Sequence, residues 1–234
     1  MTISIVNSNE ATLYSALCAN YPNEILSLTK ISHNLNGARD FIISPELALS
    51  FDEIKNCSAA YSFESNEKSP DALFLHEDVL YFVEFKEGNP NRVQKLDIRN
   101  KIHEGILTLY HFTKKYTKLS KVDFFNLKIA YVVFRRPLAS GNSFIDAVQA
   151  ASANYFIENI KGFLVGVTVV SDEPQFFVDF FHRVTSGKIT QIYVFDHNGS
   201  GTQEPYIATD VQAANLAAAN TSLPPSGKSG GTTS

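Results

Sequence analysis

Asp71, Glu84 and Lys86 carry two carboxylates and an amine, and their spacing would bring all three groups together on one β-hairpin. Apolar runs at 72–75 and 79–83 flank a short polar patch, which is typical of a hairpin. A tight turn between the runs places Asp71 opposite Glu84, with Cβ atoms ~5 Å apart. Lys86 falls on the same strand face as Glu84, because side chains alternate with a period of two. We therefore expect two acids and an amine at the open end of one hairpin.

Two carboxylates that lie this close repel each other unless a cation sits between them. Carboxylate oxygens are hard ligands that suit Mg²⁺ or Mn²⁺ better than zinc, and the six histidines show no zinc-ligand spacing. A metal on Asp71 and Glu84 would neutralise charge on a phosphate and lower the pKa of a bound water. Lys86 would position that water or stabilise the charge that develops in the transition state. The structural alternative is an ordinary cross-strand ion pair between Asp71 and Lys86.

The elements around the hairpin follow from the spacing of apolar residues. We expect helices at 9–20, 22–31, 45–57, 91–116, 143–159 and 210–220. We expect strands at 59–64, in the hairpin 70–86, and at 127–134, 162–170, 175–183 and 189–195. The helix at 45–57 is suggested by Ser44-Pro45-Glu46, which reads as an N-cap, a first-turn proline and an early acid. Glu77 and Asp78 are predicted turn residues, and the apolar run at 127–134 is typical of a buried central strand.

The order helix, three strands, helix, strand resembles the PD-(D/E)xK nuclease superfamily. The matching residues are Pro70-Asp71 on one hairpin arm and Glu84-Phe85-Lys86 on the other. The resemblance covers about residues 45–135. It implies an α/β fold with a mixed central β-sheet flanked by helices, in a restriction-endonuclease-like core (αβββαβ). It also implies a Mg²⁺- or Mn²⁺-dependent endonuclease that hydrolyses phosphodiester bonds, with DNA favoured over RNA.

The resemblance further implies metal ligands beyond the two carboxylates. The backbone carbonyl of Phe85 is one. Members of the superfamily often add an acid from the helix before the hairpin. Glu53 is the favoured choice, Glu46 and Glu24 are the alternatives, and an ordinary solvated acid is the competing interpretation of each. Glu87 should point to the opposite strand face, at the surface.

Positive charge is concentrated directly after the hairpin. Residues 86–122 contain nine Lys and Arg against three acids, whereas the whole chain has a net charge of −4. Arg92, Lys95 and Arg99 form a stripe near the start of the expected helix and are candidates for phosphate contacts, which give affinity without base specificity. A solvated basic helix face is the alternative. Arg135 and Arg136 are weaker candidates for the same role.

Composition sets the remaining bounds. The 234 residues, 44% hydrophobic with 18 Phe, predict a single nuclease-like domain over 1–209, followed by an Ala-rich segment and flexible tail over 210–234. No run approaches the ~18 apolar residues of a membrane helix, and the first residues do not read as a secretory signal. Two cysteines without disulfide spacing fit a reducing compartment, so we expect a cytoplasmic protein without membrane contact.

Two function hypotheses remain after this reading. The first is the metal-dependent nuclease, for which a homodimer is compatible because a double-strand break needs two sites. The second is a catalytically inactive nuclease-like fold that acts as a nucleic-acid-binding or assembly module. The overall acidity and the Phe-rich segments at 175–195 motivate the second hypothesis. These Phe residues are expected in the core or a subunit interface rather than stacked on bases.

Overall fold

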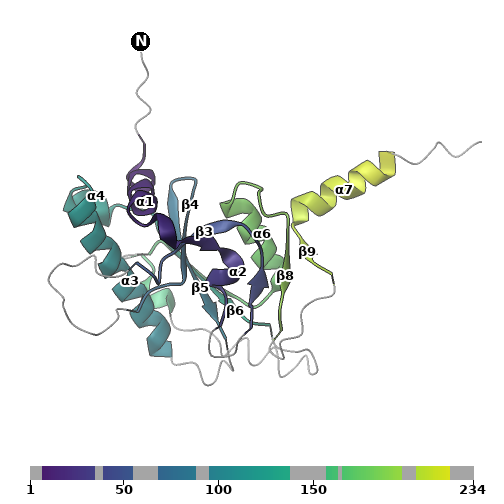
Figure 1. Ribbon diagram of the computed structural model, residues 1–234, viewed down its shortest axis with the longest axis horizontal. Helices are drawn as coiled ribbons and strands as arrows, with labels where there is room; N and C mark the ends of the chain where they lie inside the picture. The colour runs from purple at the N-terminus through teal and green to yellow at the C-terminus, as the bar shows by residue number, and fades with distance from the viewer. Residues whose placement is uncertain are drawn as a thin grey trace, which may run out of the picture.

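A mixed, six-stranded β-sheet forms the centre of the protein and is flanked by helices (Figure 1). The computed structural model describes residues 7–34, 39–54, 68–87, 95–137, 157–162, 165–196 and 204–221. In sheet order the strands are β1 (Ile25–Ser27), β3 (Leu47–Ser50), β4 (Ala72–His76), β5 (Val79–Lys86), β6 (Ile129–Arg135) and β7 (Val167–Ser171). Strands β1, β3, β4 and β5 pair antiparallel, whereas β5, β6 and β7 pair parallel. The expected α/β fold class is confirmed.

Helices cover both faces of this sheet. Helices α1 (Asn9–Asn20) and α3 (Lys95–Tyr116) lie on one face, and α6 (Pro174–Val184) lies on the other (Figure 1). A smaller antiparallel sheet contains β2 (Ile42–Ile43), β8 (Gln191–Val194) and β9 (Tyr206–Ile207). The other described helices are η1 (Pro22–Glu24), α2 (Leu28–Ile31), α4 (Lys121–Phe125), η2 (Ile157–Ile160) and α7 (Thr209–Thr221). None of the helices within the described ranges is long and apolar enough to cross a membrane.

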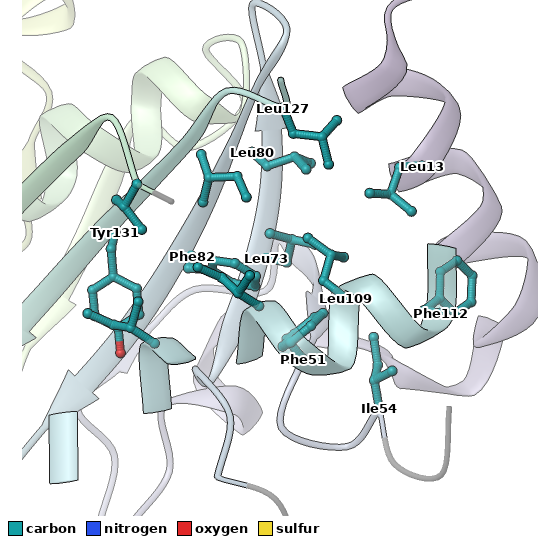
Figure 2. Close-up of a cluster of buried hydrophobic side chains, with 14 of the residues drawn as sticks. Leu13, Phe51, Ile54, Leu73, Leu80, Phe82, Leu109, Phe112, Leu127 and Tyr131 are labelled. Atoms are coloured by element: carbon teal, nitrogen blue, oxygen red, sulfur yellow. The ribbon is translucent and has the colours of Figure 1, made fainter. Parts of the chain in front are cut away.

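Strand β5 separates two hydrophobic cores because its side chains alternate between the sheet faces. Leu80 and Phe82 join the core beneath α1 and α3, whereas Val83 joins the core beneath α6. Figure 2 shows the first of these cores, with Phe82 close to Tyr131 of β6. Every residue of β6 is buried, as its continuous apolar sequence predicts. The polar residues that end β5 therefore lie at the edge of a fully packed core.

The turn of the β4–β5 hairpin has the predicted position. Glu77 and Asp78 have φ values of +47° and +57°. Positive φ at both central residues is the conformation that matches the twist of a two-residue hairpin. Asp78 also accepts a 2.6 Å hydrogen bond from the hydroxyl of Ser8, the residue that caps α1. The turn thus sets the strand register and also ties the hairpin to the first helix.

The helix predicted at 45–57 is wrong for its described residues, because 47–50 form strand β3 and 51–54 are not helical; residues 55–57 lie outside the described part of the chain. Leu47, Ala48 and Leu49 pair with β1, and Leu49 and Ser50 pair with β4. Leu47 is 57% exposed, so it does not join Phe51 and Ile54 in one buried helical stripe. Pairing with two neighbouring strands outweighed the local cap and proline signals, since tertiary contacts routinely override weak propensities.

Two further expectations are wrong. The segment at 22–31 is not one helix, since it divides into η1, β1 and α2. The segment at 175–183 is not a strand, since it lies within helix α6, whose Phe177, Phe181 and Val184 are buried at helical spacing. A dense run of phenylalanines satisfies both periods over a short window, and only packing against β4 and β6 selects the helix. These rings belong to the core, as expected.

The other expected elements agree with the structure where it describes them. Helices are present within 9–20, 91–116 and 210–220, and strands are present within 127–134, 162–170 and 189–195, with shifts of a few residues at their ends. The predicted strand at 59–64, most of the predicted helix at 143–159 and the tail from 222 lie outside the described residues.

Candidate metal and lysine site

The hairpin brings the carboxyl groups of Asp71 and Glu84 together. Ala72 pairs with Val83 and His76 pairs with Val79, which is the predicted register and places Asp71 opposite Glu84 at the end of the ladder. The Oδ2 atom of Asp71 accepts a 2.6 Å hydrogen bond from the backbone N–H of Phe85. This bond holds the Asp71 side chain against the end of β5, beside Glu84.

Lys101 of α3 lies between the two carboxylates. Its Nζ donates to Glu84 Oε2 at 2.8 Å and to Asp71 Oδ1 at 3.2 Å. Lys101 was not among the residues that the sequence predicted for this site. Only its position in the expected helix pointed to it: Lys101 comes four residues after Asp97 and directly precedes Ile102, a residue of the buried helix face. A cation does separate the carboxylates, and in this structure it is an ammonium group of the protein itself.

The predicted amine, Lys86, lies next in the same cluster. Its Nζ is 2.9 Å from Asp97 Oδ2 and 3.7 Å from Glu84 Oε1. Lys68 pairs with the other oxygen of Asp97 at 2.5 Å. Acids and amines therefore alternate through the cluster. Lys86 pairs with Asp97 and Glu84, whereas the structural alternative expected it to pair with Asp71.

Close packing between α3 and the start of the hairpin makes these contacts reachable. A Cβ on Gly105 would lie 2.6 Å from Cδ of Pro70, a distance that real structures do not show. The glycine therefore lets the helix approach the proline that precedes Asp71. Lys101 is one helical turn before Gly105, so this approach sets its reach toward the carboxylates.

Burial makes the charged form of both carboxyl groups costly unless a cation lies nearby. Glu84 is 1% exposed, and burial together with the nearby Asp71 charge raises its pKa to about 8, although Lys101 and Lys86 act in the opposite direction. Burial likewise raises the pKa of Asp71, against the opposing charge of Lys101. The pKa of Lys101 is raised because Glu84 and Asp71 outweigh the lowering effect of its burial. The ammonium is thus the positive charge that lets the buried Glu84 and the partly buried Asp71 lie side by side.

An unpartnered hydroxyl group lies near this cluster. Tyr131 is fully buried, and its hydroxyl has no hydrogen-bond partner among the described residues. Burial raises its pKa, and the charges of Glu84, Asp71 and Asp97 raise it further. In Figure 2 the hydroxyl is at the end of the ring that faces away from Leu80 and Leu127. A buried donor without a partner is uncommon and fits a site that receives a water or ligand.

Asp71 and Glu84 fit a hard divalent cation by their chemistry. Mg²⁺ is commonly bound by one or two carboxylates, with water and substrate phosphate completing its ligands. Among the described residues no group of three or more His, Cys, Asp or Glu side chains could hold a metal ion. The Phe85 N–H points toward Asp71, and strand geometry puts the carbonyl of the same residue on that strand edge. Its role as a metal ligand stays a prediction.

The third metal-ligating acid, for which the sequence favoured Glu53, stays a prediction. Glu53 is exposed and lines a cavity of about 750 Å³ together with Glu24 and Asp71. Asp52 lines the same cavity, and its negative charge raises the pKa of Asp71, although burial has the larger effect. Glu46 is occupied differently, since it pairs with Lys188 at 3.3 Å. Asp52 is thus a further candidate for the third acid, beside Glu53.

The site opens to a second cavity of about 410 Å³. Asp71, Glu84, Lys86 and Lys101 line it together, with further lining from α2 and the loop that follows. Asp71 lines both cavities, so its carboxylate is at the junction between them. This space would let a phosphate group approach both carboxylates and both amines.

The predicted phosphate-binding stripe is described only in part. Arg92 and the side chain of Lys95 lie outside the described residues. Arg99 is half-buried on α3, and its Nε has no hydrogen-bond partner among the described residues. Arg135 and Arg136 are buried and do not present a phosphate-binding surface: Arg135 lies 3.7 Å from Asp172, and Arg136 contacts Glu87.

Glu87 is not the surface residue that the sequence predicted. Its carboxylate accepts hydrogen bonds from Arg136, from Arg39 and from the amide of Asn34. Burial raises its pKa, but these hydrogen bonds outweigh that effect, so the pKa of Glu87 is lowered. The Arg136 guanidinium also lies 4.8 Å from the centre of the Phe41 ring and donates to the Phe195 carbonyl at 3.0 Å. This second ion cluster connects the main sheet to the smaller sheet.

Comparisons with protein-family models, with curated proteins and with solved structures returned no match to this chain. The geometry of the site is therefore the basis for any statement about function.

Proposed function

We propose that this protein is a metal-dependent nuclease that hydrolyses phosphodiester bonds, with DNA favoured over RNA. One observation carries the proposal: the buried carboxylate of Glu84 and the partly buried carboxylate of Asp71 meet two lysine amines at a cavity of about 410 Å³. The preference for DNA rests on the resemblance to the PD-(D/E)xK superfamily alone.

The residues divide the work of such a reaction. A divalent ion would supply Lewis-acid activation of the phosphate and of an attacking water. Asp71 and Glu84 would hold that ion, and the N–H of Phe85 fixes the orientation of the Asp71 carboxylate. Lys86 is kept in place by Asp97 at 2.9 Å, so its ammonium would stabilise charge on the phosphate without reorganisation. Burial of Glu84, whose side chain is 1% exposed, strengthens its interactions with the lysines.

A cleavage assay tests the proposal. Supercoiled plasmid, single-stranded DNA and RNA are incubated with the protein and Mg²⁺ or Mn²⁺, and with a chelator as the negative control. We expect metal-dependent cleavage that Asp71→Ala and Lys86→Ala reduce by about 10²–10³-fold or more. Lys188→Ala is the matched control, because this lysine pairs with Glu46 and lies 68% exposed. Circular dichroism establishes that each variant is folded. Cleavage at the wild-type rate by both site variants would exclude the mechanism.

A second candidate function is a nuclease-like module that binds nucleic acid or a partner protein without cleavage. Lys101 favours it, because its ammonium fills the position between the carboxylates. Calorimetric titration with Mn²⁺ separates the two candidates. Absence of metal binding and of cleavage, together with retained nucleic-acid binding in a gel-shift assay, would favour the module. Sedimentation of the protein with and without DNA would show whether a homodimer forms.

A further inference from the structure

We propose that Lys101 is a built-in counter-ion that competes with the divalent metal for the position between Asp71 and Glu84. The proposal rests on the proposed nuclease function and adds a mode of regulation to the same site. Metal loading would require the Lys101 ammonium to leave, and a substrate phosphate would offer that ammonium a new partner.

The geometry does not allow both cations at once. The Lys101 Nζ is 2.8 Å from Glu84 Oε2 and 3.2 Å from Asp71 Oδ1. A Mg²⁺ ion needs oxygen ligands at about 2.0–2.1 Å. An ion that used these same oxygens would lie within a few ångströms of the ammonium, beside the buried Glu84 carboxylate, where the repulsion is screened less than in bulk water. One of the two positive charges must therefore move.

Lys101 is the group that can move. Its amine is on a flexible four-carbon stem. It also lines the cavity of about 410 Å³, which gives its ammonium space beside the carboxylates. Lys86 borders the same cavity but is held outside the carboxylate pair, because its closer partner is Asp97 at 2.9 Å and Glu84 is at 3.7 Å. The two lysines thus have separate roles: Lys86 stays beside the metal position, and Lys101 occupies it.

The displaced ammonium needs a new anion. Within the described residues, Asp97 is already paired with Lys86 and Lys68. A phosphodiester in the cavity would supply negative charge at the point where Lys101 leaves the carboxylates. Metal and substrate would then bind with positive cooperativity, since each makes the other's binding more favourable.

Mn²⁺ affinity, measured by electron paramagnetic resonance of the free ion, tests the competition. We expect Lys101→Met to bind Mn²⁺ at least about tenfold more tightly than the wild type, because a nearby positive charge is removed. Lys101→Arg keeps the charge and should gain no affinity. Lys114→Ala is the matched control, since it removes an exposed lysine of the same helix. A phosphorothioate-linked oligonucleotide should increase the Mn²⁺ affinity of the wild type severalfold and that of Lys101→Met much less.

A second readout covers a folding defect in the methionine variant. Without metal, Lys101→Met leaves Asp71 and the buried Glu84 without the ammonium between them, so its thermal midpoint should fall. Mn²⁺ should raise that midpoint by more than it raises the midpoint of the wild type. Lys101→Gln keeps one amide donor and should show the same pattern more mildly. Equal Mn²⁺ affinity in the wild type and in both neutral variants would overturn the competition and leave the nuclease proposal intact. Tighter binding by the neutral variants without cleavage by any protein would support the competition and refute the nuclease. Failure of every variant to bind Mn²⁺ would overturn both.

Discussion

Glu84 lies near the end of β5 and Glu87 directly follows the strand; both border the cavity of about 410 Å³, but their carboxylates meet different partners. Glu87 receives two arginines and an amide, and its pKa is lowered. Glu84 is 1% exposed beside a second acid, and its pKa is raised to about 8, first by burial and then by the charge of Asp71. The partners of Glu87 stabilise its charged form, whereas burial and the Asp71 charge destabilise the charged form of Glu84.

The two acids differ in the kind of cation that they pair with: Glu87 pairs with arginines and Glu84 with lysines. Arginine offers a planar set of fixed donors, which suits a permanent connection between two sheets. Lysine offers a compact charge on a mobile stem, which suits a group that yields its place. An acid whose charged form is destabilised in the native state is also a common mark of a functional site. We therefore interpret the Glu87 cluster as structural and the Glu84 cluster as the centre of chemistry.

The largest expected effect is on cleavage by Glu84→Gln. Loss of one of two carboxylates should reduce metal-dependent cleavage by about 10³-fold. The free energy of unfolding should not fall and should rise by up to about 1 kcal/mol. The raised pKa of Glu84 means that its charged form is destabilised in the folded state, the amide removes the repulsion with Asp71, and Lys101 keeps Asp71 as a partner. Cleavage kinetics and urea unfolding at pH 7 measure the two effects. A clear loss of stability would show that Glu84 is a structural acid like Glu87.

Glu87→Gln should give the reverse pattern. Two guanidinium groups lose their shared negative charge inside the protein, so the free energy of unfolding should fall by about 1–3 kcal/mol. Cleavage by the folded fraction should change less than about threefold, because Glu87 borders the same cavity but its carboxylate pairs with Arg39 and Arg136 rather than with the site lysines. Urea unfolding and cleavage kinetics at a temperature well below the midpoint test this. A large loss of cleavage without a change in stability would break the comparison.

A smaller effect is expected on stability at low pH. It comes from Asp97, the residue that pairs with Lys86. Burial raises its pKa, but Lys68 and Lys86 outweigh this and lower the pKa to about 2. A folded pKa below the unfolded value of about 3.9 contributes stability above that value, and this stability is lost as the pH falls from about 4 to 2. The contribution should be about 1 kcal/mol, since the ion pairs lie near the surface. Unfolding of the wild type and of Asp97→Asn at several pH values measures it. Parallel pH curves for the two proteins would contradict the assignment.

Local patterns were sufficient for the hairpin and the central strand. The two apolar runs around Glu77-Asp78 fix the register, because a slip by one residue would move every buried side chain to the opposite face. The same argument brought Asp71, Glu84 and Lys86 together. Local patterns failed at 45–57, where the signals of a helix start compete with pairing to β1 and β4. They also failed at 175–183, where many phenylalanines fit either period.

The sequence by itself determined the pair of acids and the amine on one hairpin, because strand alternation and a two-residue turn are short-range constraints. Only the tertiary structure decided which cation lies between the acids. Lys101 is 17 residues from Glu84 and 30 from Asp71, and it reaches both because Gly105 lets α3 pack against Pro70. The same holds for Glu87, whose arginine partners Arg39 and Arg136 come from distant segments. Charge compensation inside a protein depends on groups that meet only after the chain has packed, and residue spacing along one element does not contain that information.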